Sequence, residues 1–483
     1  IKPSISHILF AVEIWYNLVT RKKQAGTTII TQTKNKVNKN QSQTQRRQKM
    51  KNIKKFVSLI LVLVSLTVLA IPFAPISASA ASTDVTVTES ISNIYVDTSK
   101  DYYVVKNTAT MRSSTGLFYS VYANLAKNTV IKINGSNGDF HKVKVTENNK
   151  SLTYYIKKSE LKKASSNTKA TFAYAVKDAP LRKAPRDDGS KIATIKKGTV
   201  LYVLGNITNQ HKSKWLVVMD QDMRLGYIFN NNVKTTSKIT VSVSGPAFVS
   251  TASPANFTCK VSPSEITGIK WSVSDTKLAD IDRSGKLTAK AGGNVTVIAS
   301  LGKLTSVELK ANAYLGVKAV FQSNNVCCSA ASTVAVLHYK GKATTKKDTD
   351  LFPKIQGYVY KIRDQLNENL GENFYCYNTF KSYEAYEKAI RASLAQNCPV
   401  IARIGKFEKQ YFNYGSNGHY TVIVGIYEQD GEVWLKVVDS FVNRYKSNTY
   451  CDAKSGVIEI PAKTLYEYGK YGGKSPVYLI YNN

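Results

Sequence analysis

Several residue types and motifs are scarce or missing in this sequence, and each scarcity excludes a class of protein. Only 12 prolines and 27 glycines occur among 483 residues, which excludes a collagen-like protein. There is one long apolar run, so a protein with several membrane spans is excluded. No P-loop is present, which excludes an ATP-driven exporter. The 6 cysteines and 5 histidines show no zinc-type spacing, and we expect neither a metal nor a cofactor.

Apolar and aromatic residues are present in amounts that favour folded, β-rich domains. Hydrophobic residues make up 43% of the chain, which excludes wholesale disorder. Aromatic residues make up 10%, with 30 tyrosines among them, as is typical of strands. At roughly 100–200 residues per domain, the length predicts three or four domains.

Residues 50–80 have the three parts of a secretory signal. Lysines follow Met50, the apolar run Phe56–Ile71 comes next, and Ala78-Ser79-Ala80 is an A-x-A cleavage pattern. This run of 16 residues is shorter than the ~20 that a spanning helix needs, so we expect cleavage rather than an uncleaved membrane anchor. Residues 1–49 show no domain-like pattern and are expected to be an over-extended reading frame or a disordered extension.

The charge of the chain is strongly positive, at +34. Residues 1–81 hold 13 basic residues and 1 acidic residue, which leaves 54 basic and 32 acidic residues, or +22, in the remainder. A charge of this size calls for a polyanion, and nucleic acid is one candidate. No nucleic-acid motif occurs, however. For a chain with a secretory signal we expect an extracellular polyanion as partner, such as the anionic polymers of a cell wall, and no nucleic acid.

An internal repeat at an offset of seventy residues defines two units, 103–163 and 170–236. Two matches carry it: Met111-Arg112 with Leu181-Arg182, and Leu125–Ile133 with Ile195–Val203. Short alternating strands between polar turns predict a small all-β barrel for each unit.

The second unit resembles bacterial SH3-like (SH3b) domains, and the first is a degraded copy that lacks equivalents of Pro185 and Gly198. The resemblance implies binding to cell-wall peptide or glycan. Trp215, Tyr202 and Tyr227 would then form an aromatic binding face. The alternative is that they belong to the barrel core, which we favour for Trp215.

Residues 238–313 consist of alternating segments of about five residues separated by Gly, Asn and Asp turns, which predicts a β-sandwich. The pattern that begins at Trp271 resembles the group 2 bacterial Ig-like domain. We expect this domain to be a spacer or adhesion module with Trp271 in its core. Residues 81–102 are expected to be a linker.

The C-terminal domain, residues 317–483, has mixed helix and strand patterns. We predict helices over Ser329–Tyr339 and over Lys381–Gln396, the second with Ser382 as its N-cap. Strands are predicted over Val400–Arg403, Tyr420–Ile426, Val433–Val438 and Val477–Ile480. A cysteine-led helix followed by a sheet that carries a histidine is the order of a papain-like α+β fold.

This domain contains the groups that cysteine chemistry needs. Cys328 opens a predicted helix, where the dipole favours thiolate. His419 lies at a strand start and suits a base, and Asp439 lies at a strand end and suits an orienting group. Gln322, six residues before Cys328, suits an oxyanion donor. His338 lies on the same helix as Cys328 and cannot easily face the thiol.

These residues resemble the double-glycine peptidases and especially their secreted C39-like relatives. The family pattern C-G-P-A-S appears as Cys328–Ser332, G-H-x-V-V-V-G as Gly418–Gly425, and D-P as Asp439-Ser440. The resemblance implies that Cys328 is the nucleophile, His419 the base, Asp439 the orienting group and Gln322 the oxyanion donor. Two residues depart from the pattern, Ser329 for glycine and Ser440 for proline. The neighbouring Cys327 is a second thiol, but the spacing selects Cys328.

The sequence therefore predicts a secreted, wall-associated cysteine peptidase that acts on a peptide or protein. One alternative is a peptidoglycan endopeptidase or amidase of the NlpC or CHAP type, and another is a non-catalytic wall-binding adhesin. The chain carries no L-P-x-T-G signal, so wall attachment is expected to be non-covalent. Cys376, Cys398 and Cys451 could pair with one another or with Cys327, and the sequence leaves the pairing open.

Overall fold

The computed structural model describes residues 84–92, 94–97, 101–165, 167–371, 374–470 and 476–482. The predicted extension 1–49 and signal sequence 50–80 lie outside the described residues. No helix among the described residues is long and apolar enough to cross a membrane. The chain is multidomain, with a mostly β N-terminal region and a C-terminal domain of helices and strands.

The N-terminal region begins with the two repeats. The strands of the first are β2 (Ile94–Asp97), β3 (Tyr102–Val105), β4 (Ala109–Arg112), β5 (Val121–Leu125), β6 (Val130–Lys132), β7 (Ser136–Asn137), β8 (Phe140–Glu147), β9 (Lys150–Lys157) and β10 (Leu161–Lys163). Those of the second are β11 (Asn167–Ala175), β12 (Ala179–Arg182), β13 (Lys191–Ile195), β14 (Val200–Asn209), β15 (Lys214–Met219), β16 (Leu225–Phe229) and β17 (Val233–Thr236). The 3-10 turns η1 (Lys158–Glu160) and η2 (Asn230–Asn232) precede β10 and β17.

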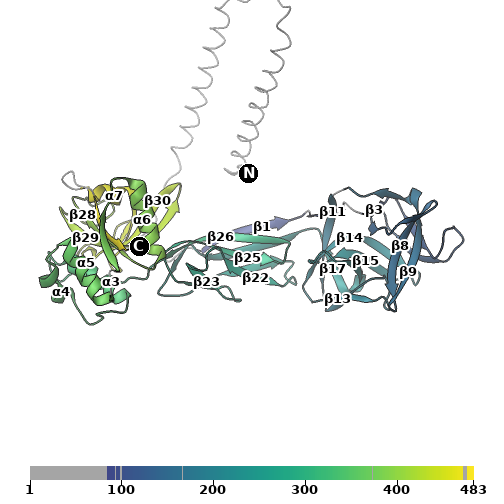
Figure 1. The fold of residues 1–483 in the computed structure, drawn as a ribbon, viewed down its shortest axis with the longest axis horizontal. Coiled ribbons are helices and arrows are strands. Elements are labelled where there is room, and N and C mark those ends of the chain that lie inside the picture. Colours follow the sequence, from purple (N-terminus) through teal and green to yellow (C-terminus); the bar gives the residue numbers. More distant parts are fainter. Residues whose placement is uncertain are drawn as a thin grey trace, which may run out of the picture. The chain divides into compact units, whose positions relative to one another are not determined.

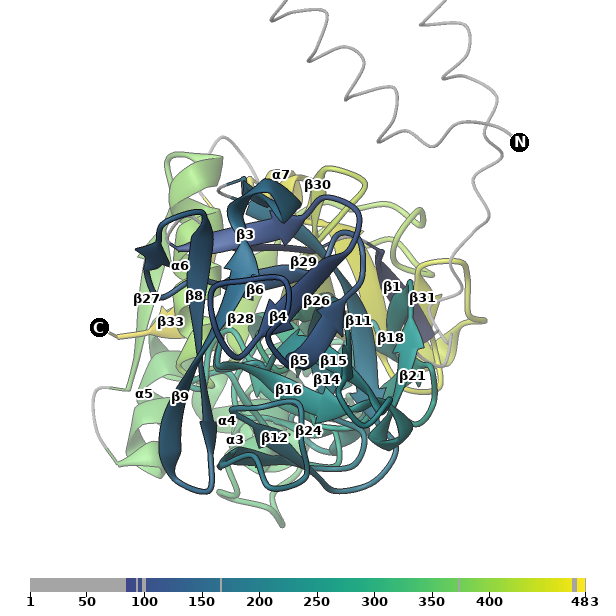
Figure 2. The same ribbon diagram turned by 90° about the vertical axis from the view of Figure 1, so that its right-hand side faces the viewer.

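The repeat seen in the sequence is also a repeat of strand pairing. β4 pairs with β5 and β9, and β12 pairs with β13 and β16. β3 pairs with β6 and β10, and β11 pairs with β14 and β17. The long β8–β9 hairpin of the first repeat (Figure 2) corresponds to β15–β16 in the second. A register shift falls within both Met111-Arg112 and Leu181-Arg182, so the matched sequence pair adopts the same bulge in each repeat.

Aromatic residues of the second repeat belong to its core. Trp215 is 2% exposed, Tyr202 3% and Tyr227 6%. The core interpretation is therefore confirmed, and the interpretation of these three rings as a binding face is wrong. Burial of these large rings supplies much of the apolar area that a small β-rich unit can enclose.

A second group of sheets follows. Its strands are β1 (Asp84–Ile91), β18 (Ile239–Pro246), β19 (Phe248–Ser250), β20 (Ala255–Asn256), β21 (Thr258–Ser262), β22 (Ile269–Val273), β23 (Ala279–Ile281), β24 (Lys286–Ala289), β25 (Gly293–Leu301) and β26 (Thr305–Tyr314). They form sheets ordered β1-β18-β21, β19-β26-β25-β22 and β20-β24-β23. Trp271 is only partly buried and packs against the core at its edge, whereas Phe257, which is 1% exposed, belongs to the core itself, so the expectation that Trp271 lies in the core is met only in part.

Strand β1 corrects the expectation that residues 81–102 form a linker. Asp84–Ile91 pairs with β18 over its whole length, from Asp84 opposite Pro246 to Ile91 opposite Ile239. The strand is rich in Thr and Ser and buries little, so its composition resembles that of a linker. Strand β1 is held in place by main-chain hydrogen bonds to β18, some 150 residues away in the sequence. The composition of a segment cannot reveal pairing with so distant a partner.

The C-terminal domain is built on one seven-stranded sheet, ordered β27-β33-β28-β29-β30-β32-β31. Its strands are β27 (Tyr375–Thr379), β28 (Val400–Ile404), β29 (His419–Gln429), β30 (Glu432–Val438), β31 (Cys451–Asp452), β32 (Val457–Pro461) and β33 (Val477–Tyr481). Its helices are α3 (Cys328–Tyr339), α4 (Asp348–Ile355), α5 (Val359–Leu370), α6 (Tyr383–Ala395) and α7 (Ala462–Gly469), with the 3-10 turn η3 (Val442–Arg444). Figure 1 shows α3, α4 and α5 grouped together, with β28 and β29 beside them.

The predicted elements of this domain are confirmed within two residues at most ends. The N-cap of α6 is also confirmed, because the Ser382 side chain accepts a hydrogen bond from the Ala385 amide at 3.2 Å. β29 is buried along nearly its whole length because it lies in the middle of the sheet and is covered on both faces. Helices α4, α5 and α7 had not been predicted.

Candidate active site

The two neighbouring thiols, Cys327 and Cys328, lie in different environments. A bend at residues 323–324 and a turn at residues 325–327 lead into α3, and Cys328 is its first residue. Cys328 is partly exposed, whereas Cys327 is 1% exposed. Burial raises the pKa of the Cys327 thiol. Cys327 is therefore a buried, protonated thiol, and Cys328 is the one that solvent and ligands can reach.

The pKa of Cys328 lies below its usual value. Burial alone would raise it, but a hydrogen bond with His419 and the charge of that ring lower it, as do the backbone amides of Tyr420 and Ser329. The N-terminus of α3 favours the same charge. Cys328 is thus held towards the thiolate form, which is the nucleophilic form of cysteine.

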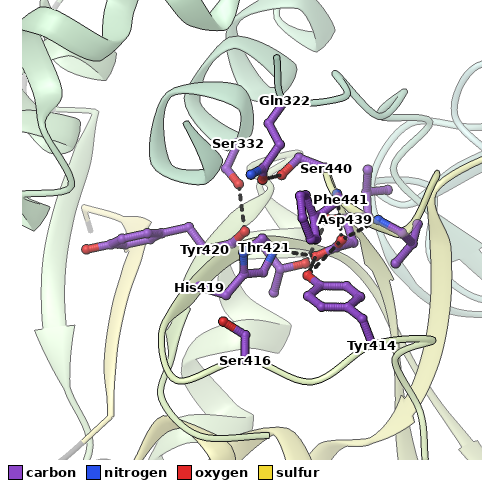
Figure 3. Close-up of polar contacts among 12 residues, drawn as sticks. Gln322, Ser332, Tyr414, Ser416, His419, Tyr420, Thr421, Asp439, Ser440 and Phe441 are labelled. Atoms are coloured by element: carbon purple, nitrogen blue, oxygen red, sulfur yellow. Dashed lines mark hydrogen bonds and ion pairs between the residues drawn. The ribbon is translucent and has the colours of Figure 1, made fainter. Parts of the chain in front are cut away.

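His419 is the first residue of β29 and is 5% exposed. Its Nε2 lies 2.6 Å from Asp439 Oδ2 (Figure 3), which leaves Nδ1 as the ring nitrogen that can face Cys328. Burial opposes the charged ring, but the carboxylate of Asp439 and the hydrogen bonds to Asp439 and Cys328 raise the pKa of His419 to about 10. The imidazole is therefore held protonated beside a thiolate.

Asp439 follows β30 and is fully buried. Besides His419, it accepts hydrogen bonds from the Tyr414 hydroxyl at 3.2 and 3.3 Å and from the amides of Phe441 at 2.8 Å and Val442 at 3.2 Å. Burial, followed by the nearby Asp439 charge, raises the pKa of Tyr414, so its hydroxyl keeps its proton and donates. These hydrogen bonds replace the water contacts that the buried carboxylate has lost, and they fix the orientation of the Asp439 side chain.

Tyr414 had not been identified from the sequence, because one tyrosine among 30 carries no local signal. Its ring lies 5.7 Å from that of His419, in an edge-to-face arrangement, and it stacks on the exposed Tyr445 at 5.5 Å. Figure 3 shows Tyr414 on the far side of Asp439 from Gln322.

Gln322 is 5% exposed and lies against the residue that follows Asp439. Its amide Nε2 donates to Asn324 O at 2.6 Å, and its Oε1 accepts from Ser440 Oγ at 2.9 Å (Figure 3). Its backbone amide also donates to Ser440 O at 2.9 Å. The structure thus brings Cys328, His419 and Asp439 into one hydrogen-bonded chain, and it joins Gln322 to that chain through Ser440.

The remaining histidine of the domain and the other thiols lie outside this cluster. His338, near the C-terminal end of α3, has its Nε2 3.1 Å from the carbonyls of Ala343 and Lys346. It therefore organises the loop after the helix. All six cysteines are described and free, so none of the pairings left open by the sequence is formed. Within the described ranges, no group of His, Cys, Asp and Glu could hold a metal ion.

A partly exposed thiol at a helix N-terminus, bonded to an imidazole that a buried carboxylate orients, is the arrangement used by cysteine peptidases. Residues 314–455 match the model of the Peptidase_C39 like family. This part of the chain is therefore similar to C39-like peptidases. No match is found among curated proteins.

Two solved structures are also similar to this chain, both from Trichomonas vaginalis. NlpC2 shares 13% sequence identity at a TM-score of 0.15, and the match covers 32% of this chain and 50% of that one. NlpC1 shares 14% identity at a TM-score of 0.15, over 34% of this chain and 51% of that one. The chain thus spans about half the length of these structures.

Proposed function

We propose that the C-terminal domain is a cysteine peptidase that hydrolyses peptide bonds. One observation carries the proposal: His419 is held by the buried Asp439 at 2.6 Å and is hydrogen-bonded to Cys328, whose pKa is lowered. A buried carboxylate is costly unless it holds a charged partner. An ion pair built from these groups is of little use to a structural domain, whereas cysteine peptidases depend on it.

The chemistry follows from the positions of these groups. The Cys328 thiolate attacks the carbonyl carbon, and the negative charge that develops on oxygen is met by an amide N–H of Gln322 and by free amides at the start of α3. The His419 imidazolium gives its proton to the leaving amine, which leaves a thioester on Cys328. His419 then takes a proton from water, and the resulting hydroxide attacks the thioester and releases the acid. Asp439 keeps the ring oriented throughout.

The first test measures the reactivity of Cys328 as a function of pH, without any assumption about the substrate. Iodoacetamide is expected to alkylate Cys328 well below the usual pH range of a thiol, since the pKa of the thiol is lowered. Mass spectrometry of tryptic peptides can follow this reaction. Cys376 serves as the internal comparison, because burial raises the pKa of that partly exposed thiol. Equal pH profiles for the two cysteines would contradict the proposal.

Substrate class separates this function from its nearest alternative. A peptidoglycan endopeptidase or amidase of the NlpC or CHAP type would use the same thiol and imidazole on wall peptides. A peptide library analysed for new termini and purified wall sacculi analysed for released fragments distinguish the two. Cleavage of the library alone supports a peptidase, and solubilised wall supports the alternative. A protein that does neither, with an unreactive Cys328, would be a non-catalytic adhesin.

We further propose that the chain is secreted and held at a bacterial cell wall. The signal-like residues 50–80 support secretion. The repeats 103–163 and 170–236 would be SH3-like wall-binding barrels, and residues 238–313, joined by β1, an Ig-like spacer. The strand pairing repeated between the first two units, and the three small sheets formed by β1 and the strands of residues 239–314, are consistent with these assignments. Since Trp215 and its neighbours are buried, a wall contact would use other residues. The first barrel exposes Leu117, Phe118 and Tyr119 in one loop, at 58%, 103% and 52%.

Wall retention is expected to depend on salt. The excess of +22 beyond residue 81 would bind anionic wall polymers, and about 1 M salt screens such attraction almost completely. Cys328→Ala protein, which cannot digest the wall, would be sedimented with purified sacculi at low and high salt, and with sacculi stripped of anionic polymers. We expect release at 1 M salt and weaker binding to stripped walls. Binding that is insensitive to both would contradict an electrostatic attachment.

A further inference from the structure

We propose that Ser440 is a positioning residue that sets the orientation of the Gln322 amide for oxyanion binding. This inference rests on the proposed peptidase function. Ser440 stands where the C39-like pattern has proline, so the family resemblance assigns it no role. In this chain it makes a contact that a proline, which has no hydroxyl group, could not make.

Two contacts fix which way the Gln322 amide points, and Figure 3 shows the one with Ser440. Asn324 O can only accept a hydrogen bond, so the group 2.6 Å from it must be the amide nitrogen of Gln322. The amide oxygen then faces Ser440 Oγ at 2.9 Å, and the serine hydroxyl must be the donor. With the amide flipped, two oxygens would face each other at Asn324. Ser440 and Asn324 together therefore select one of the two orientations.

This orientation leaves a hydrogen-bond donor free. The amide nitrogen of Gln322 carries two hydrogens, and one of them is used by Asn324 O. Among the described residues, the second has no acceptor, although Gln322 is 5% exposed. A hydroxyl that donates to the amide oxygen also polarises the amide and makes its N–H a stronger donor. Such a donor suits an oxygen that gains charge only during the reaction.

Ser440 also links the two halves of the proposed site. It directly follows Asp439, which orients His419, and its backbone carbonyl accepts from the Gln322 backbone amide at 2.9 Å. A little further along, Arg444 donates to Gln322 O at 3.3 Å and to Asn325 Oδ1 at 3.1 Å. One short segment after β30 therefore fixes both the imidazole and the amide donor. A shift of this segment would disturb both.

The test separates the oxyanion donor from the thiol–imidazole pair by using two probes. N-acetylglycinal, ¹³C-labelled at its aldehyde carbon, adds to Cys328: the thiolate forms a C–S bond as the C=O π bond breaks, and the oxygen, which can take its proton from the His419 imidazolium, lies where the oxyanion would. Its dissociation constant is read by ¹³C NMR. The rate of Cys328 alkylation by iodoacetamide needs only the thiolate. We expect Ser440→Ala to weaken aldehyde binding roughly tenfold, less than the ~10²–10³-fold loss of a whole oxyanion donor, and to leave alkylation unchanged within about twofold.

Two further variants decide whether Ser440 acts through Gln322. Ser440→Thr keeps the hydroxyl and should retain aldehyde binding. In a Gln322→Ala background, Ser440→Ala should have no further effect, because the group that it positions is gone. A tenfold loss that persists in the double variant, or wild-type aldehyde binding by Ser440→Ala, would overturn the inference. A Cys328 that reacts no faster below pH 8 than a free peptide thiol would instead overturn the proposed function.

Discussion

Cys328→Ala is expected to reduce peptide-bond hydrolysis by roughly 10⁴–10⁶-fold, since removal of the nucleophile abolishes the covalent route and leaves only substrate binding and the oxyanion donors. The measurement is turnover of a peptide found in the library screen, at a fixed enzyme concentration and with active-site titration of the wild type. The substitution removes one sulfur from a partly exposed position, so the fold should be retained.

Cys327→Ala is the matched control, because it removes the adjacent thiol on the same turn. Cys327 is buried and its pKa is raised, so it should not contribute to reactivity. We expect activity within a few-fold of the wild type. Activity that survives in Cys328→Ala and is lost in Cys327→Ala would show that Cys327 is the nucleophile, and would refute the assignment.

Asp439→Asn has the second largest expected effect, a loss of roughly 10³–10⁴-fold in kcat, since an amide no longer holds the imidazole in the productive orientation and charge. The carboxylate is a main cause of the raised pKa of His419. Without it that pKa falls, the ring loses its proton at lower pH, and the Cys328 thiolate loses its charged partner. The onset of iodoacetamide alkylation should therefore move to higher pH.

The matched control is Asp430→Asn, at the exposed turn between β29 and β30. Asp430 has a φ of 52°, which asparagine also tolerates, so this substitution should change neither turnover nor the alkylation profile. Alkylation profiles that coincide for Asp439→Asn and the wild type would show that the carboxylate does not sustain the ion pair, and would contradict the proposed role.

The His419–Asp439 pair also predicts the direction in which the stability of the folded state changes with pH. The folded-state pKa of His419, about 10, lies above its ordinary value of 6.5. The folded state therefore binds this proton more tightly than the unfolded state does. The resulting contribution to the free energy of unfolding is fully present below pH 6.5, and it is lost as the pH rises through about 10. Asp439→Asn should remove most of this dependence.

Local signals predicted a large part of the fold. The N-cap at Ser382, the helix that starts at Cys328 and the central strand beginning at His419 could all be read from neighbouring residues, because capping and periodicity act over a few positions. The repeat was likewise visible, since Met111-Arg112 and Leu181-Arg182 share the arginine, an apolar neighbour and the same bulge. Helices α4 and α5 carry a local signal too, because each buries apolar residues four positions apart, Leu351 and Ile355 in α4 and Ile362 and Leu366 in α5.

The sequence by itself determined the order of the chemical groups: a thiol at a helix start, a histidine at a strand start, an aspartate at a strand end and a glutamine before the thiol. It could not determine which contacts join them. The hydrogen bond from Ser440 to Gln322 spans 118 positions, Tyr414 reaches Asp439 across 25, and β1 pairs with a strand more than 140 residues away. Each of these contacts depends on long-range packing of the sheets, which only the tertiary structure provides, because local propensity carries no information about distant partners.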